Sequence, residues 1–191
     1  MINLKIIVSS LLGLSAISTQ AAIIAFDIQG KGGFGLLSTN EVNAPTGLAG
    51  SGGEVGQGIT YNDVTNVLTL NFAWGSANGF TDLTGNATAG HIHGATPSGG
   101  AASFNQSVGV AFGLDSGPTW NASATAGGVT NRTVTFTEAQ EVDLLAGKFY
   151  LNIHTATNGG GEIRGSLVIP ETSSVVLGAV GMLGLLVRKR R

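Results

Sequence analysis

The sequence contains no cysteine among its 191 residues. This absence excludes a disulfide-stapled miniprotein, a cysteine-ligated metal domain and an enzyme with a catalytic thiol. Charged residues are scarce, at 10% of the chain, and histidine occurs only three times. The sequence has no G-x-S-x-G motif, and few histidines are present to act as a general base. Both observations argue against a serine hydrolase.

The amino terminus has the order of segments that is typical of a secretory signal peptide. Lys5 is followed by an apolar run over residues 6–17 and then by small and polar residues up to Ala22. The run is about 12 residues long, whereas a membrane-spanning helix needs roughly 20, which makes a retained anchor the weaker alternative. We therefore expect residues 1–22 to be a cleaved signal peptide.

The carboxyl terminus is apolar as well, and a basic cluster ends it. Residues 173–187 are rich in Gly, Val and Leu, and Arg188, Lys189, Arg190 and Arg191 follow at once. As a helix the apolar segment would be about 22 Å long, against a hydrocarbon core of about 30 Å, which predicts a thin membrane anchor. Basic residues keep the tail in the cytoplasm, so the rest of the chain is expected on the outer side of the membrane.

Three residues before this segment, Pro170, Glu171 and Thr172, complete a recognisable pattern. Residues 170–191 resemble the bacterial PEP-CTERM sorting signal, a short Pro-Glu-Pro motif followed by a hydrophobic helix and an Arg-rich tail, with Thr172 where the family usually has Pro. The resemblance implies an inner-membrane intermediate, cleavage by an exosortase-type processing enzyme and delivery to the cell surface or extracellular matrix. A permanent single-pass anchor is the alternative.

Acidic residues dominate the part of the chain between the two ends. Residues 23–171 hold four basic and eleven acidic side chains, a formal net charge of −7. An acidic domain without a basic patch is a poor binder of nucleic acid, so no nucleic-acid partner is expected. The length suits one domain, which we place at residues 23–169.

The pattern of this domain predicts an all-β fold. Short segments of Val, Ile, Thr and aromatic residues alternate with clusters of Gly, Asn, Asp and Ser, as in antiparallel sheets. The expected strands are residues 23–29, 58–61, 67–74, 87–93, 107–112, 132–136, 149–155 and 162–169. Eight strands in this length favour a Greek-key-like antiparallel β-sandwich or barrel.

One short helix and two long loops interrupt the strands. Thr137 and Gln140 have the spacing of a capping box, Val142, Leu144 and Leu145 supply an apolar face, and Gly147 ends the helix. Residues 94–106 and 113–131 are rich in small and polar residues, so we expect them to be surface loops.

The three histidines lie in two predicted strands. His91 and His93 flank Ile92, and His154 follows Ile153. Because side chains alternate along a strand, the isoleucines are expected in the core and the imidazoles on the opposite face. The same alternation places Glu162 and Arg164 on that face, beside His154 if the last two strands form a hairpin.

Several motifs together carry a second resemblance. Residues 89–94 read Ala-Gly-His-Ile-His-Gly, residues 144–147 Leu-Leu-Ala-Gly, residues 149–155 Phe-Tyr-Leu-Asn-Ile-His-Thr and residues 161–165 Gly-Glu-Ile-Arg-Gly. From about residue 23 to residue 169 the sequence resembles the CHRD domain, first described in chordin, an extracellular antagonist of bone-morphogenetic-protein growth factors. Similar bacterial proteins are surface or secreted proteins without established chemistry, so the resemblance implies location and architecture rather than activity.

Metal binding is one interpretation of the histidines. His91, His93 and His154 are a feasible ligand set for copper or zinc, with Glu162 as a fourth ligand or as a hydrogen-bonding partner of a ligand. The His-x-His strand is similar to that of copper/zinc superoxide dismutases, although those enzymes use four histidines at copper. The alternative is a structural network in which the histidines, Glu162, Arg164 and Asn152 join two strands by hydrogen bonds.

The function that these patterns favour is that of an exported, non-enzymatic surface or matrix module that acts by adhesion or ligand binding. Its ligand would be a polysaccharide, a protein or another surface component. No catalytic residue and no organic cofactor are predicted. A metal-binding domain or a superoxide-dismutase-like oxidoreductase is the alternative, and carbohydrate binding by an exposed Trp74 or Trp120 is a third hypothesis.

Overall fold

The computed structural model describes residues 21–43, 45–47 and 50–170, and within them the protein is a twelve-stranded, wholly antiparallel β structure. This confirms the all-β prediction. The expected signal peptide and the sorting segment with its basic tail lie outside the described residues, apart from residues 21 and 22 and Pro170. The strands are β1 (Ile23–Gly30), β2 (Gly33–Phe34), β3 (Leu36–Leu37), β4 (Ser51–Glu54), β5 (Ile59–Asn62), β6 (Val67–Trp74), β7 (Ala87–His93), β8 (Val110–Gly113), β9 (Trp120–Asn121), β10 (Gly128–Thr135), β11 (Tyr150–Thr155) and β12 (Ile163–Val168).

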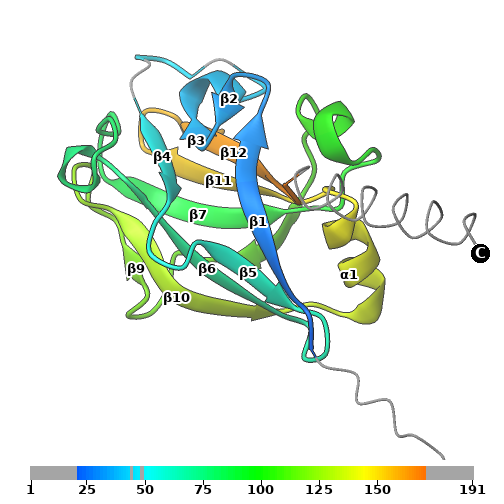
Figure 1. Ribbon diagram of the computed structural model, residues 1–191. Coiled ribbons are helices and arrows are strands. Elements are labelled where there is room, and N and C mark those ends of the chain that lie inside the picture. Colours follow the sequence, from blue (N-terminus) through cyan, green and yellow to red (C-terminus); the bar gives the residue numbers. More distant parts are fainter. Residues whose placement is uncertain (1–20, 44, 48–49, 171–191) are drawn as a thin grey trace, which may run out of the picture.

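Strand β1 closes the sheet on itself. It pairs with β5 through its first half and with β12 through its second half. The strands β1, β5, β6, β4, β3 and β12 therefore form a ring, from which β11, β7 and β8 continue on one side and β10 and β9 on the other (Figure 1). The pairing combines features of a barrel and of a sandwich, and it places β7 next to β11.

The core lies behind β7 and β11. Ile92, Leu151, Ile153 and Ile163 have no exposed surface and join one apolar cluster with residues of β6 and β10. Trp74 is also fully buried, and its Nε1 donates to the carbonyl of Ser123 at 2.8 Å.

The tryptophans belong to this core. Trp120 is half-buried, and its ring centroid lies 5.3 Å from that of Trp74. The hypothesis of carbohydrate binding by exposed tryptophans is therefore wrong for Trp74, because its ring has no exposed surface.

Most predicted strands are confirmed, and residues 67–74 and 87–93 match β6 and β7 residue for residue. The sequence analysis missed β2, β3, β4 and β9. Strand β4 reads Ser-Gly-Gly-Glu and has no apolar alternation to detect. A Cβ atom on Gly52 would lie 2.4 Å from the carbonyl oxygen of Ala73, so the close approach of two backbones requires glycine there.

The remaining elements are one α-helix, α1 (Glu138–Leu145), and three 3-10 turns, η1 (Ser38–Asn40), η2 (Ser76–Asn78) and η3 (Gly100–Ser103). The predicted capping box between Thr137 and Gln140 is confirmed, and Gly147 follows the helix at φ +70°. The predicted apolar face is wrong in part, because only Leu144 is buried while Val142 is 69% exposed. No helix within the described ranges has the length and apolarity to span a membrane.

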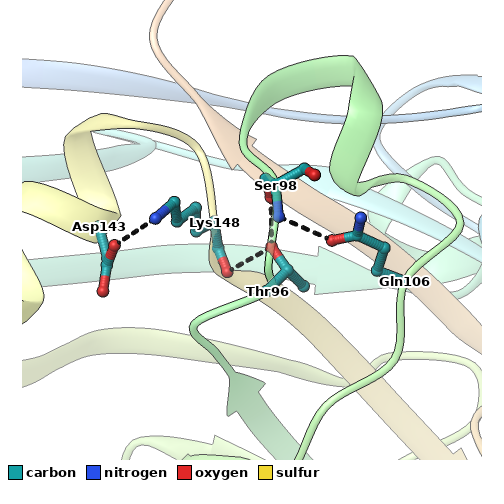
Figure 2. A network of polar contacts seen from close by, with 5 residues as sticks. All are labelled: Thr96, Ser98, Gln106, Asp143 and Lys148. Atoms are coloured by element: carbon teal, nitrogen blue, oxygen red, sulfur yellow. Dashed lines mark hydrogen bonds and ion pairs between the residues drawn. The ribbon is translucent and has the colours of Figure 1, made fainter.

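The two predicted surface loops are partly buried. Leu114 and Val129 have no exposed surface, and Thr96 and Ser103 are only 1% exposed. Figure 2 shows how residues 94–106 are fastened. The hydroxyl of Thr96 donates to the carbonyls of Ser98 and Lys148, and the Ser98 amide donates to Oε1 of Gln106 at 3.0 Å. Polar side chains thus help to fasten this loop to the segment between α1 and β11.

Candidate metal centre

Strands β7 and β11 bring the three histidines together on one face. Their register pairs His93 with Tyr150 and His91 with Asn152, and His154 lies opposite Ala89. Ile92 and Ile153 are fully buried behind them, which confirms the predicted alternation. One nitrogen atom from each of the three imidazoles lies within 4.8 Å of the others.

Two of the three rings use one nitrogen to contact the backbone. Nδ1 of His93 lies 2.9 Å from the carbonyl oxygen of Val108, and Nδ1 of His154 lies 3.0 Å from that of Gly159. Because a carbonyl only accepts, each Nδ1 carries the proton and each Nε2 keeps its lone pair. Nε2 of His154 is 3.0 Å from Nδ1 of His91, and Nε2 of His93 is buried without a hydrogen-bond partner.

The surroundings of His93 and His154 favour the neutral form of these two rings. Burial lowers the pKa of His93, and the nearby charges of His91, His154 and Arg164 lower it further, against the hydrogen bond to Val108, which raises it. Burial likewise lowers the pKa of His154, opposed by the hydrogen bond to Gly159 and by Asp115. A neutral imidazole is the form that binds a metal ion.

Glu162 is near in sequence, but its carboxylate belongs to another network. It has no exposed surface and accepts hydrogen bonds from the Thr84 amide and hydroxyl, the Thr155 hydroxyl and the Asn158 amide group. Burial raises the pKa of Glu162, but these hydrogen bonds outweigh burial and the net shift is downward. Gly161 at φ +122° precedes Glu162, and β12 begins only at Ile163, so the alternation of the strand does not extend to Glu162.

Asn152 and Arg164 lie on the face of the histidines, as predicted, but Arg164 is only 2% exposed. Its guanidinium donates to the carbonyl of Gln106 and to the hydroxyl of Ser107. Among the described residues, no hydrogen bond joins Glu162, Asn152 or Arg164 to an imidazole. Instead, His91 and His154 lie within hydrogen-bonding distance of each other, and His93 and His154 each bond a backbone carbonyl.

The sequence analysis missed the groups that orient the rings. The carbonyls of Val108 and Gly159 leave no signal in a sequence, because every residue has one. Tyr150 stacks on His93 with ring centroids 4.8 Å apart and an interplanar angle of 2°. Tyr150 precedes Asn152 by two residues and His154 by four in one strand, and residues at this spacing share a face of the sheet. The sequence could therefore have placed Tyr150 beside the histidines.

A cavity of the described residues lies elsewhere. It has a volume of about 550 Å³ and is lined by residues of β1, β2 and β12 and by the segments around η3 and the end of α1, with none of the histidines. The histidine cluster lies on two strands, with His91 and His154 half-buried and His93 buried.

Comparison with known proteins identifies the family. The model of the CHRD domain family matches residues 34–167, which include both histidine-bearing motifs. Neither curated proteins nor solved structures gave a match. Because the match spans most of the β domain, the chain belongs to the CHRD domain family, whose members occur in extracellular or secreted proteins.

Proposed function

We propose that this protein is an exported CHRD domain that binds a copper or zinc ion through His91, His93 and His154. The main observation that supports the proposal is the fixed tautomer of the His93 and His154 rings. His93 and His154 both donate Nδ1–H to a backbone carbonyl, which leaves each Nε2 unprotonated. Histidines that ligate metals have this second hydrogen bond almost without exception.

The cluster also fits a metal ion by distance and by burial. With metal–nitrogen bonds near 2.0–2.1 Å, two nitrogens on one ion lie roughly 3 to 4 Å apart. The nitrogens here lie within 4.8 Å of one another, so small shifts of the rings would bring them to bonding distance. His93 Nε2 is a buried acceptor without a partner, and a bound ion would satisfy it.

The donor set indicates which metals to expect. Imidazole suits both copper and zinc, and the order of stability of divalent ions favours Cu²⁺ over Zn²⁺. Three imidazoles are one fewer than the four at the copper of superoxide dismutases, so the proposal is binding without turnover. Three protein ligands leave one position for water or another donor.

The location is proposed from the order of the terminal segments. An apolar run after Lys5 and a second one before the basic tail, Arg188 to Arg191, support export and anchoring at the inner membrane. Cleavage near Pro170 by an exosortase-type enzyme would release the domain to the cell surface or matrix. Adhesion to a surface polysaccharide or protein remains part of this proposal.

Metal content of the full chain tests the proposed function. The protein is stripped of metal, titrated with Cu²⁺ and Zn²⁺ in competition with a coloured chelator, and analysed for bound metal after gel filtration. We expect one ion per chain and a rise in melting temperature, both lost in His91→Ala.

A second variant controls for adventitious binding by carboxylates. Glu141 lies on α1, outside the histidine cluster. Glu141→Gln should bind metal as the wild type does. A wild-type chain that stays metal-free, or a His91→Ala variant that keeps its ion, would refute the proposed function.

A further inference from the structure

Tyr150 is held between an imidazole and a guanidinium. Its ring stacks on His93, and Cζ of Arg164 lies 3.4 Å from the ring centroid. The three side chains come from β7, β11 and β12, which are adjacent in that order. At these distances the two groups cannot share one face of the ring, so His93 lies on one side of Tyr150 and Arg164 on the other.

The same three side chains hold the segment of residues 106–108. Nδ1 of His93 and the hydroxyl of Tyr150 both contact the carbonyl oxygen of Val108, at 2.9 Å and 3.3 Å. The Val108 amide lies 3.2 Å from the Tyr150 hydroxyl oxygen, and Arg164 binds Gln106 and Ser107. Tyr150 therefore contacts both the ring of His93 and the Val108 carbonyl that accepts the hydrogen bond from that ring.

This arrangement decides which nitrogen of His93 is protonated. A neutral imidazole carries one N–H, and an acceptor placed at Nδ1 selects the tautomer with Nε2 free. The acceptor works only while the Val108 carbonyl stays in the ring plane. The ring of Tyr150 limits the tilt of the His93 ring by stacking on it. The hydroxyl of Tyr150 limits the position of the Val108 carbonyl by its hydrogen bond.

We infer that Tyr150 is a positioning residue that holds His93 as the Nδ1–H tautomer and so presents its Nε2 to a metal ion; the second half of this inference rests on the proposed function. The phenol does not ligate the ion. Loss of the hydrogen-bond partner of a ligating histidine alters metal affinity by about 10- to 100-fold, and Tyr150 acts on such a partner, the Val108 carbonyl.

Tyr150→Phe tests the inference, because it keeps the stacked ring and removes only the hydroxyl. The first measurement uses the metal-free full chain and assigns the imidazole tautomers from long-range proton–nitrogen NMR spectra. The wild type should show His93 protonated at Nδ1 alone, whereas Tyr150→Phe should show a mixture with protonation at Nε2. The second measurement repeats the Cu²⁺ and Zn²⁺ titrations and should find affinity about 10- to 100-fold weaker in Tyr150→Phe.

Tyr61→Phe is the matched control. Tyr61 is fully buried, and its hydroxyl donates one hydrogen bond, to Oδ1 of Asn66 at 3.1 Å. The Tyr61→Phe variant should change neither the His93 tautomer nor the metal affinity. A purely structural role for Tyr150 would lower the melting temperature in both variants and leave the tautomer unchanged.

The outcomes separate this inference from the proposed function. If the wild type binds no metal, the proposed function fails, and the tautomer spectra alone decide whether Tyr150 positions His93. If the wild type binds metal and Tyr150→Phe matches it in tautomer and affinity, the inference fails while the proposed function stands. Equal losses in Tyr61→Phe and Tyr150→Phe would also overturn the inference.

Discussion

Nδ1 of His91 lies 3.0 Å from Nε2 of His154, although 63 residues separate them in the chain. His154 donates its Nδ1–H to Gly159, so its Nε2 is the acceptor and His91 supplies the proton. If His154 took up a second proton at Nε2, His91 would have to carry its own proton on Nε2 for the contact to persist.

Metal affinity should fall as the pH is lowered. The pKa values of His93 and His154 lie below the model-peptide value of 6.5, so the rings are neutral and ready to bind at pH 7. As the pH falls toward these lowered pKa values, protons compete with the ion for the same nitrogens. Zn²⁺ titrations between pH 5 and 8 should show a plateau near neutrality and a steep loss on the acid side. Affinity that is independent of pH over this range would contradict ligation by histidine.

Glu41→Gln should stabilise the domain at alkaline pH. Glu41 is 5% exposed, and burial raises its pKa to about 7, against the opposing charges of Arg164 and Lys31. Because the folded pKa exceeds the unfolded value of 4.5, its contribution to stability is present below pH 4.5 and is lost as the pH rises through about 7.

Urea unfolding at pH 4 and pH 8 measures this effect. The glutamine variant should match the wild type at the lower pH and exceed it at the higher one by up to about 3 kcal/mol, at 1.36 kcal/mol per pKa unit. An equal difference between the two proteins at both pH values would show that ionisation of Glu41 is not the cause.

Gly90→Ala should destabilise the layer behind the histidines. A Cβ atom on Gly90 would lie 2.6 Å from the ring of Trp120 and 3.2 Å from Cδ1 of Ile153. Overpacking of this kind costs about 1–3 kcal/mol. Gly85 has no atom within 4 Å of the same position, so Gly85→Ala is the control. Thermal melting that fails to separate the two variants would contradict the packing described for Trp120.

Deletion of residues 173–191 should leave the β domain folded and change only its location. The last strand of the described residues, β12, ends at Val168, before the deleted segment begins. We expect an unchanged melting temperature together with loss of surface display, measured by labelling of intact cells. Normal display of the truncated chain would contradict the role proposed for the terminal segment.

Local pattern was enough to predict β6 and β7, but it missed β3, whose Leu36 is fully buried. Strands β6 and β7 were predicted at their observed bounds, and so was the capping box of α1, because alternation and capping depend on residues within a few positions. Strand β4 was not predicted because Gly52 and Gly53 have no side chains whose alternation could indicate a strand. It pairs with β6 from Gly52 to Glu54.

The sequence by itself determined that Ile92 and Ile153 face the core and that the imidazoles face away, since side chains alternate on every strand. The pairing of β7 with β11, in the register that gathers His91, His93 and His154, depends on the folded chain as a whole. The tertiary structure also turned Glu162 toward Thr84 and Thr155, and it placed the Val108 carbonyl and Tyr150 against His93. Such contacts join residues far apart in the chain, and backbone carbonyls carry no residue identity, so no local pattern can specify them.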